Sequence, residues 1–465
     1  DTGVKAILTT SELQGKISVF KAFLGEAAKL EIIAVDKVES KSKDYIEQDI
    51  DIASKALIQY TSGTSGISKG VLLTHKNLLH NASLLQEMQV EANSFYNVEH
   101  STLIWLPLYH DMGLISGVIL PLLFDMPTVL MPPLIFLQKP FRWLKAMSKY
   151  KTKYTMAPNF AYELCNKRIT NEQVKTLDLS NWQVALNGAE TIRAETLERF
   201  INKFAPCGFR PETFYPAYGL AESTVFVTGG LKNAPPVFLK VNKKALEINK
   251  VEILAKDSSD SIILVGVGKT WLDQEVKIVN PETLELCKDD EIGEIWIKGD
   301  SVASEYWKNE EETKKVFNVT LSTNSKKYLR SGDLGFIDNN ELYITGRIKD
   351  LIIIHGLNYY PQHIEQTVEK LHESFRAGCN AAFSIDLANE EKLIVIQEIR
   401  KDSVIDDLKK LENDVKLAIT ENHGVHPHEV KFIKHGSIFK TSSGKIQRRL
   451  CKKKYLEGKL ELWSN

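Results

Sequence analysis

The apolar and polar positions alternate along the chain in short segments. Apolar runs at 6–8, 31–35 and 56–58 are separated by stretches with a helix-like pattern. This rhythm is typical of an α/β fold, in which strands and helices follow one another. Further along, 271–283 and 293–299 alternate apolar and polar residues between polar turns, as β-ribbons do. The pattern therefore predicts α/β sheets together with a smaller strand-rich subdomain.

The longest weakly charged span, 112–138, contains one acidic residue, Asp125. A membrane-spanning helix needs about 20 apolar residues in a row. Four prolines interrupt this span, namely Pro121, Pro127, Pro132 and Pro133. We therefore expect buried core here, with no membrane span.

Composition narrows the class of protein. The 465 residues suggest about three domain-sized units, and two large domains also fit. A formal net charge of −1 argues against a general nucleic-acid-binding protein. The five cysteines are odd in number and scattered, without a Cys-x-x-Cys pair. This usage indicates a reducing compartment, so we expect a cytoplasmic protein without disulfides or a zinc site.

The stretch 60–70 reads Tyr-Thr-Ser-Gly-Thr-Ser-Gly-Ile-Ser-Lys-Gly and lies between two apolar segments that we expect to be strands. Its glycines allow the backbone to turn amides inward, and Lys69 adds a positive charge. Such a loop suits a polyphosphate, although a solvated surface loop would have a similar composition. A Walker-type loop is excluded, because Ser68 precedes the lysine, Gly70 follows it, and a strand comes next.

The same stretch resembles the signature loop of the adenylate-forming enzymes, Thr-Ser-Gly-Thr-Thr-Gly-x-Pro-Lys-Gly. These enzymes are the acyl-CoA synthetases, the adenylation domains of peptide synthetases and the luciferases. Here Ser65 and Ser68 replace a threonine and the proline of that pattern. The resemblance implies that the loop and Lys69 bind the phosphates of ATP. The loop residues concerned are Thr61, Ser62, Gly63, Thr64, Ser65 and Gly66.

Two further stretches follow in the order of that superfamily. His110 and Asp111 end an apolar run with the pattern Leu-Pro-x-x-His. A lone histidine in such a place is more often structural, but the resemblance implies that His110 and Asp111 line the pocket for the acyl adenylate. A tight turn after the run 182–186 allows close approach to a flat ligand. The resemblance places the adenine beside this turn, at Asn187, Gly188, Ala189 and Glu190.

The segment 218–222 resembles the Tyr-Gly-x-Thr-Glu pattern, with Ala221 where threonine is common. The resemblance implies that Tyr218 stacks on adenine and that Glu222 binds Mg²⁺, an ion that prefers carboxylate oxygens and phosphates. The remaining members of the expected nucleotide pocket are Gly219 and Leu220. Two later landmarks extend the site: Asp333 is expected on the ribose hydroxyls and Arg347 on ribose or phosphate.

The C-terminal part carries the last two landmarks. Lys349 matches the hinge of the superfamily, so we expect a large domain at 1–348 and a small α+β domain at 349–465. Lys445 ends the motif Lys-Thr-x-x-Gly-Lys, whose last lysine enters the active site during adenylation. The basic run after it is expected to be an exposed helix. Three histidines that could suggest a metal site are expected in a solvated loop instead, His423, His426 and His428.

Within the superfamily, the chain most closely resembles the fatty acyl-AMP ligases. Three local matches carry this resemblance, at 105–114, 158–165 and 187–190. The lysine-rich segment 231–261 also resembles the insertion of that family. The resemblance implies ATP- and Mg²⁺-dependent activation of a medium- or long-chain fatty acid to acyl-AMP. The acyl group would then pass to an acyl carrier protein or to a carrier domain of a polyketide or peptide synthase. The alternatives are a long-chain acyl-CoA synthetase and a non-catalytic nucleotide- or acyl-adenylate-binding protein.

The resemblance also implies the architecture. We expect a large domain built from two α/β sheets and a small β-rich subdomain, followed by a small mobile domain. Members of the superfamily have further strands and helices before the point that corresponds to residue 1, so part of the large domain is expected upstream.

Overall fold

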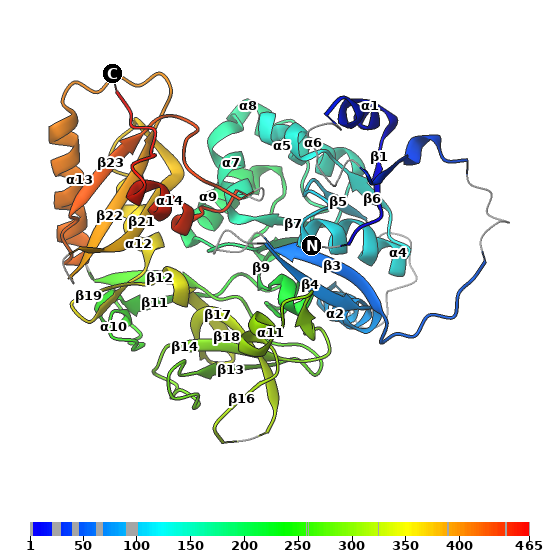
Figure 1. Ribbon diagram of the computed structural model, residues 1–465. Helices are drawn as coiled ribbons and strands as arrows, with labels where there is room; N and C mark the ends of the chain where they lie inside the picture. The colour runs from blue at the N-terminus through cyan, green and yellow to red at the C-terminus, as the bar shows by residue number, and fades with distance from the viewer. Residues whose placement is uncertain are drawn as a thin grey trace.

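The structure is a computed structural model, shown in Figure 1. The first three quarters of the chain hold several sheets, and the C-terminal part, coloured yellow to red, forms a separate group of strands and helices at one side. The described residues are 3–20, 29–39, 46–61, 68–89, 101–256, 258, 260–323, 325–387, 390–441 and 444–464.

The largest sheet has six strands in the order β10-β9-β8-β7-β5-β6. Neighbouring strands are parallel except β10, which runs antiparallel to β9. These strands are β5 (Thr102–Ile104), β6 (Thr128–Leu130), β7 (Tyr154–Pro158), β8 (Val184–Gly188), β9 (Phe214–Tyr218) and β10 (Thr228–Gly229). Parallel strands need long crossovers, and helices occupy them here. These helices include α3 (Asp111–Leu114), α4 (Leu120–Leu123), α5 (Pro133–Gln138), α6 (Phe141–Tyr150), α7 (Asn159–Arg168), α8 (Asn171–Val174) and α9 (Ala194–Phe204).

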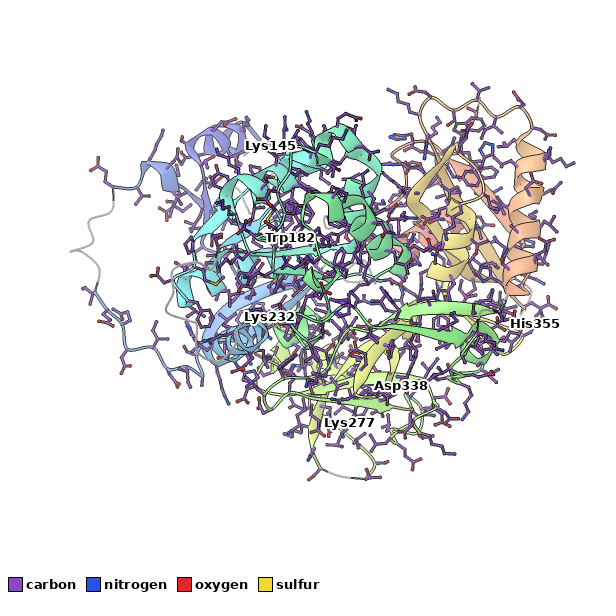
Figure 2. All side chains as sticks on the ribbon, turned by 180° about the vertical axis from the view of Figure 1, so that it is seen from behind. Lys145, Trp182, Lys232, Lys277, Asp338 and His355 are labelled. Atoms are coloured by element: carbon purple, nitrogen blue, oxygen red, sulfur yellow. The ribbon has the colours of Figure 1, made fainter. Side chains whose placement is uncertain are left out.

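The helices pack on the sheet through apolar faces. Helix α9 buries Leu197, Phe200 and Phe204, which recur every three or four residues and therefore share one face. Trp182, labelled in Figure 2, packs against this face, with its ring centroid 6.2 Å from that of Phe200. It also lies 5.5 Å from Trp143 of α6. The aromatic core therefore joins helices from two different crossovers.

The apolar span 112–138 forms short elements around this core. It contains α3, a π-helical turn at Ile115–Ile119, α4, β6 and α5, and it buries Met112, Ile115 and Phe136. The expectation of buried core is confirmed only in part, because other apolar side chains of this span are exposed, among them Leu122 and Leu134. Among the helices of the described residues, none combines the length and the apolar character that crossing a membrane requires.

A second, smaller sheet carries the expected phosphate-binding stretch. Its strands are β3 (Lys55–Thr61), β4 (Lys69–Thr74) and β15 (Glu305–Tyr306), in the order β15-β4-β3. Helix α2 (His75–Gln89) follows β4 directly, and Thr74 caps it by accepting a 3.2 Å hydrogen bond from the Asn77 N–H. Near the start of the chain, β1 (Ala6–Thr9) and β2 (Glu31–Ala34) pair in parallel, with α1 (Ser11–Phe20) between them.

The expected strand-rich subdomain is an antiparallel sheet in the order β13-β14-β17-β16, with β18 paired to β17. Lys277 and Asp338, both labelled in Figure 2, mark β13 and β17 of this sheet. Its elements are β13 (Glu275–Val279), β14 (Gly293–Lys298), α11 (Glu310–Val316), β16 (Val319–Thr320), β17 (Lys327–Asp338) and β18 (Glu341–Arg347).

The segment 231–261 contains ordered secondary structure. It includes β11 (Phe238–Asn242) and α10 (Lys243–Leu246), and β11 pairs antiparallel with β12 (Ser261–Val265). This pairing joins the two ends of the segment.

After Ile348–Asp350, a short 3₁₀ turn, the chain forms the C-terminal group. Its three-stranded sheet has the order β21-β22-β23, and an apolar core of its own includes Ile364, Val395 and Val415. The elements are β19 (Ile352–Ile354), β20 (Leu357–Tyr359), α12 (Pro361–Glu369), β21 (Phe375–Leu387), β22 (Glu390–Ile399), α13 (Leu408–His423), β23 (Glu429–Ile433) and α14 (Arg448–Leu456). One expectation is wrong: His423 is the last residue of α13 and only 8% exposed, so it does not lie in a solvated loop.

Candidate active site

The hairpin β3–β4 presents the expected phosphate-binding stretch at its tip. Thr61 pairs with Lys69 in the register of the two strands. Lys69 forms an ion pair with Glu312 of α11, and its Nζ lies 5.0 Å from the ring centroid of Tyr306. Of the expected phosphate ligands, Ser62, Gly63, Thr64, Ser65 and Gly66 lie outside the described residues.

The loop after β9 carries Glu222. Gly219 is required there, because a Cβ at this position would meet the Val225 carbonyl oxygen at 1.7 Å. The Glu222 carboxylate is partly exposed and accepts a 2.7 Å hydrogen bond from the Tyr306 hydroxyl. A carboxylate has about four acceptor positions, so this one retains capacity for a cation. The group fits Mg²⁺, which takes one or two carboxylates together with phosphate oxygens.

Three expected nucleotide residues form one connected chain. The Tyr218 hydroxyl donates to Asp333 Oδ2 at 2.7 Å, and Arg347 Nε donates to Asp333 Oδ1 at 2.8 Å. Asp333 is 4% exposed. Its charge is the main cause that raises the pKa of Arg347. Burial, and then the charge of Asp333, raise the pKa of Tyr218 well above its ordinary value. Asp333 is therefore a buried acceptor between a neutral phenol and a cation.

His110 and Asp111 lie at the start of α3. His110 Nδ1 lies 2.6 Å from Asp111 Oδ1. The pKa of Asp111 is lowered. Burial alone would raise it, but the hydrogen bond from His110 and the charges of His110 and Lys445 outweigh that effect. Asp111 is therefore ionised at neutral pH. Tyr109 precedes His110, and its carbonyl accepts a 2.9 Å hydrogen bond from the side-chain amide of Gln59, which fixes the backbone at this point.

The turn after β8 is placed by packing against neighbouring backbone. A Cβ at Gly188 would meet the Ala217 carbonyl oxygen of β9 at 2.9 Å. Gly188 is therefore needed for close contact between β8 and β9. From the sequence alone, the tight turn was explained only by the close approach of a flat ligand. Ala189 has a positive φ of 67°, and Glu190 accepts a 2.5 Å hydrogen bond from the Phe160 N–H. Burial is the main cause that raises the pKa of Glu190.

Asn187 is fully buried at the end of β8. Its Nδ2 donates to Asn159 Oδ1 at 3.4 Å, and Asn159 Oδ1 also accepts a 3.2 Å hydrogen bond from the Arg193 N–H. Asn187 Oδ1 is a buried atom without a hydrogen-bond partner among the described residues. An acceptor in this condition suits a donor such as an exocyclic amine.

Lys445 reaches these groups from the C-terminal part of the chain. Burial lowers its pKa, and so does the cation of Arg347, while Asp111, Glu190 and Asp333 act in the opposite direction. The loop of Lys445 is held by Thr441, which donates its N–H to the Lys445 carbonyl at 2.8 Å. A Cβ at the neighbouring Gly444 would lie 3.7 Å from the ring of Phe160, whose N–H bonds Glu190. The charge of Lys445 therefore interacts with landmarks from four other stretches of sequence.

Arg448 is a member of this region that the sequence did not reveal. We expected an exposed basic helix here, but the Arg448 side chain is only 20% exposed. Its Nε and one terminal nitrogen donate to the two carboxylate oxygens of Glu365 at 2.7 and 2.6 Å. Its other terminal nitrogen donates to Asp350 at 3.2 Å. Tyr306, which bonds Glu222, was missed as well. Neither residue belongs to a motif that sequence alone makes visible.

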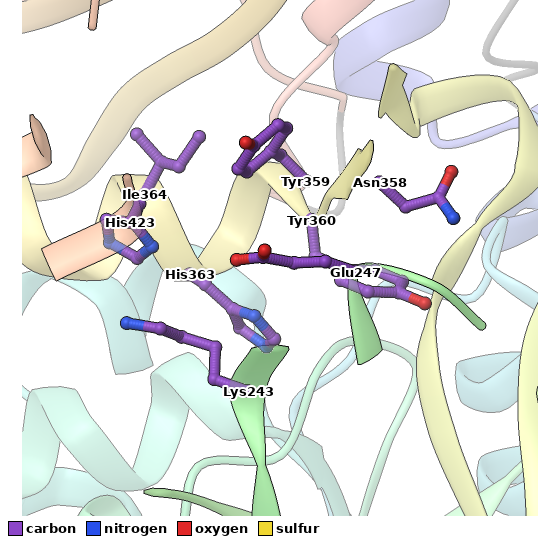
Figure 3. A pocket seen from close by; sticks show the side chains of 8 residues that line it. All are labelled: Lys243, Glu247, Asn358, Tyr359, Tyr360, His363, Ile364 and His423. Atoms are coloured by element: carbon purple, nitrogen blue, oxygen red, sulfur yellow. The ribbon is translucent and has the colours of Figure 1, made fainter. Parts of the chain in front are cut away.

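The C-terminal group contacts the rest of the chain at two places. Arg193 of the N-cap of α9 forms an ion pair with Glu369 at the end of α12. On the other side, the Glu247 carbonyl accepts a 2.8 Å hydrogen bond from the Asn358 N–H. Figure 3 shows a small pocket at this second contact. Its lining includes Lys243, Glu247, Asn358, Tyr359, Tyr360, His363, Ile364 and His423.

Comparison with known proteins agrees with this geometry. The family model described as AMP-binding enzyme matches residues 1–307, and a second model, described as Disco-interacting protein 2-like, AMP domain, matches residues 349–465. The medium-chain-fatty-acid–[acyl-carrier-protein] ligase JamA of Moorena producens is 42% identical over 443 residues, which cover 94% of this chain and 74% of JamA. The 4-hydroxyphenylalkanoate adenylyltransferase of Mycobacterium marinum is 36% identical, with 98% of this chain and 74% of the relative covered.

A solved structure shows the same fold. It is the crystal structure of the fatty acyl-adenylate ligase of L. pneumophila in complex with acyl adenylate and pyrophosphate. It is 39% identical to this chain, has a TM-score of 0.71, and the match covers 97% of this chain and 78% of that one. The chain therefore belongs to the AMP-binding enzymes, and within this adenylate-forming superfamily it is a fatty acyl-AMP ligase.

Proposed function

We propose that the protein converts a fatty acid and ATP to fatty acyl-AMP and pyrophosphate, and then passes the acyl group to the phosphopantetheine thiol of a carrier protein. One observation carries the first step: the charge of Lys445 interacts with those of Asp111, Glu190, Asp333 and Arg347, although its loop comes from the far end of the chain. The comparisons support the acyl group and the carrier, since JamA is named a medium-chain-fatty-acid–[acyl-carrier-protein] ligase.

In the first step a carboxylate oxygen of the fatty acid attacks the α-phosphorus of ATP. A new carboxylate–phosphorus bond forms, the bond from the α-phosphorus to the bridging oxygen breaks, and pyrophosphate leaves. Both reactants are anions, so charge repulsion and alignment make up much of the barrier. We assign Lys445 to orient the carboxylate and the α-phosphate through its ammonium group, which is fixed before the reaction begins.

The other residues are assigned to binding. Asp333 would accept the ribose hydroxyls, with Arg347 on ribose or phosphate and Tyr218 against the adenine. The buried, unpartnered Asn187 Oδ1 supports an adenine site at 187–190, since the amino group of adenine is a donor. The loop 61–66 and Lys69 would bind the β- and γ-phosphates. To do so, Lys69 would exchange the carboxylate of Glu312 for phosphate.

We assign Glu222 as the protein ligand of Mg²⁺, which would offset the phosphate charge as pyrophosphate forms. The partly exposed carboxylate and its hydrogen bond from Tyr306, which leaves further acceptor positions, support this assignment.

We further propose that 1–348 and 349–465 are the two domains and that Lys349 is the pivot between them. Lys349 is an exposed residue of a short 3₁₀ turn between two groups with separate apolar cores. After adenylation, rotation at this point would withdraw Lys445 and admit the thiol, which would attack the acyl carbonyl, form the thioester and release AMP. A cytoplasmic location belongs to the same proposal.

The acceptor is tested with dodecanoate and ATP in two parallel reactions. One contains coenzyme A and the other a phosphopantetheinylated carrier protein. We expect acyl-AMP to persist with coenzyme A and to be consumed by the carrier. Rapid formation of acyl-CoA would instead identify a long-chain acyl-CoA synthetase. Bound nucleotide without acyl-AMP in either reaction would identify a non-catalytic binding protein.

A further inference from the structure

A strained turn follows the proposed metal ligand Glu222. Thr224 has φ 67° and ψ −67°, and the Val225 N–H donates to the Ser223 carbonyl at 2.8 Å across it. A β-branched residue at positive φ is a backbone outlier, and such residues persist only where the surrounding structure holds them. Thr224 is fully buried. Some nearby group must therefore fix this turn.

Asn81 of α2 is that group. It is completely buried, and its side chain faces the turn. Its Nδ2 donates to the Phe226 carbonyl at 2.9 Å and to the Ser223 carbonyl at 3.3 Å. Its Oδ1 accepts a 3.2 Å hydrogen bond from the Phe226 N–H. One amide thus bonds the backbone on both sides of Thr224 and spans the strained residue.

Ser301 completes the support from a third segment. Its hydroxyl accepts a 3.0 Å hydrogen bond from Asn81 Nδ2 and lies 2.7 Å from His80 Nδ1. Its carbonyl accepts a 2.8 Å hydrogen bond from the Thr224 hydroxyl. The backbone carbonyl of Glu222 accepts a 2.9 Å hydrogen bond from the Ala303 N–H in the same segment. The turn is therefore held from both sides.

Helix α2 follows β4, the strand that begins with Lys69. Asn81 therefore connects the helix behind the phosphate-binding hairpin to the loop of Glu222. If helix α2 moved relative to the loop of Glu222, Lys69 and the Glu222 carboxylate would move apart. The proposed function assigns both residues to the same triphosphate.

We propose that Asn81 is a positioning residue that holds the Thr224 turn and thereby aims the Glu222 carboxylate at the divalent cation of the bound nucleotide. This inference rests on the proposed role of Glu222. Groups that orient a metal ligand typically contribute 10–100-fold to metal affinity. Asn81 itself touches neither cation nor nucleotide.

The test compares Asn81→Ala with Asn77→Ala. Asn77 lies one turn earlier on α2, is also buried, and donates its amide to the carbonyls of Asp300 and Val302. Both variants lose buried hydrogen bonds, but only Asn81 bonds the Glu222 turn. Binding of Mn²⁺ is measured by electron paramagnetic resonance in the presence of a non-hydrolysable ATP analogue, and the melting temperature is recorded for each variant.

We expect both substitutions to lower the melting temperature and only Asn81→Ala to weaken Mn²⁺ binding, by about 10–100-fold. Equal Mn²⁺ affinity in Asn81→Ala and wild type would overturn the inference and leave the proposed function intact. Equal weakening in Asn77→Ala would also overturn it, because it would show a general structural effect. A wild-type protein that binds the analogue without Mn²⁺ would overturn the role of Glu222 itself.

If Asn81→Ala does not fold, the double variant Asn81→Ala/Thr224→Gly gives the same test. Glycine adopts the positive φ without strain, so the turn no longer needs the Asn81 amide for stability. Loss of that amide should still weaken Mn²⁺ binding while the fold is retained. Unchanged Mn²⁺ affinity in the double variant would contradict the inference.

Discussion

Replacing Lys445 by alanine removes the cation of the C-terminal loop that interacts with Asp111, Glu190 and Asp333. The carboxylates of Asp111 and Glu190 both interact with its charge, and both would remain after the substitution. The fatty acid carboxylate and the α-phosphate would then meet in a site with less positive charge. Removal of one preorganised donor costs about 10²–10³ in rate. This corresponds to about 3–4 kcal/mol in the activation free energy of adenylation.

The assay is formation of acyl-AMP from dodecanoate and ATP, followed in a single turnover. Lys440→Ala is the matched control, because Lys440 is an exposed lysine at the start of the same loop and its Nζ donates to Cys379 Sγ at 3.1 Å. We expect the control to retain adenylation. Transfer from preformed acyl-AMP to the carrier should also survive in Lys445→Ala, because the lysine is assigned only to the first step. Wild-type adenylation in Lys445→Ala would refute the assignment.

Two further predictions concern the C-terminal group. Arg448→Met leaves the buried carboxylate of Glu365 without its cation, so chemical denaturation should show a loss of about 3 kcal/mol in the free energy of unfolding. The same variant should slow adenylation more than it slows transfer to the carrier. The exposed neighbour Arg449→Met should do neither, and equal effects would contradict the role of the ion pair. In the pocket of Figure 3, burial lowers the pKa of His363 to about 3 and of His423 to about 4. Both rings are therefore neutral in the folded protein, whereas the unfolded chain takes up protons as the pH falls through 6.5, so the protein should become less stable as the pH falls. Between pH 7.5 and 5.5 we expect the free energy of unfolding to decrease by about 1.4 kcal/mol per ring. His423→Gln should remove about half of this total decrease, and an unchanged pH dependence in that variant would contradict this explanation.

The α/β class and the main strands were predictable because their signal is local. The apolar segments on either side of the stretch 60–70 became β3 and β4, and the alternating stretches 271–283 and 293–299 contain β13 and β14. Apolar periodicity and capping residues act over a few positions, so a single sequence contains them. The pairing of β11 with β12 was not predictable in this way, because it joins residues 19 to 27 positions apart in the sequence.

The candidate site was predictable only where a motif marks it. Glu222 and Asp333 were found through neighbouring residues in the sequence, whereas their partners Tyr306 and Arg347 lie 84 and 14 positions away. Arg347 belongs to a motif, and Tyr306 does not. Asn81 appears in the sequence as an ordinary helical residue. Its contacts with the turn 223–226 exist only in the folded chain, 142 to 145 positions away.

Exchange of labelled pyrophosphate into ATP shows directly whether this site joins a fatty acid to AMP, because exchange requires a reversible adenylation step and needs no thiol. We expect exchange that depends on dodecanoate and proceeds without coenzyme A or carrier protein. Nucleotide binding without any exchange, across a series of fatty acids, would show that the site does not adenylate a fatty acid.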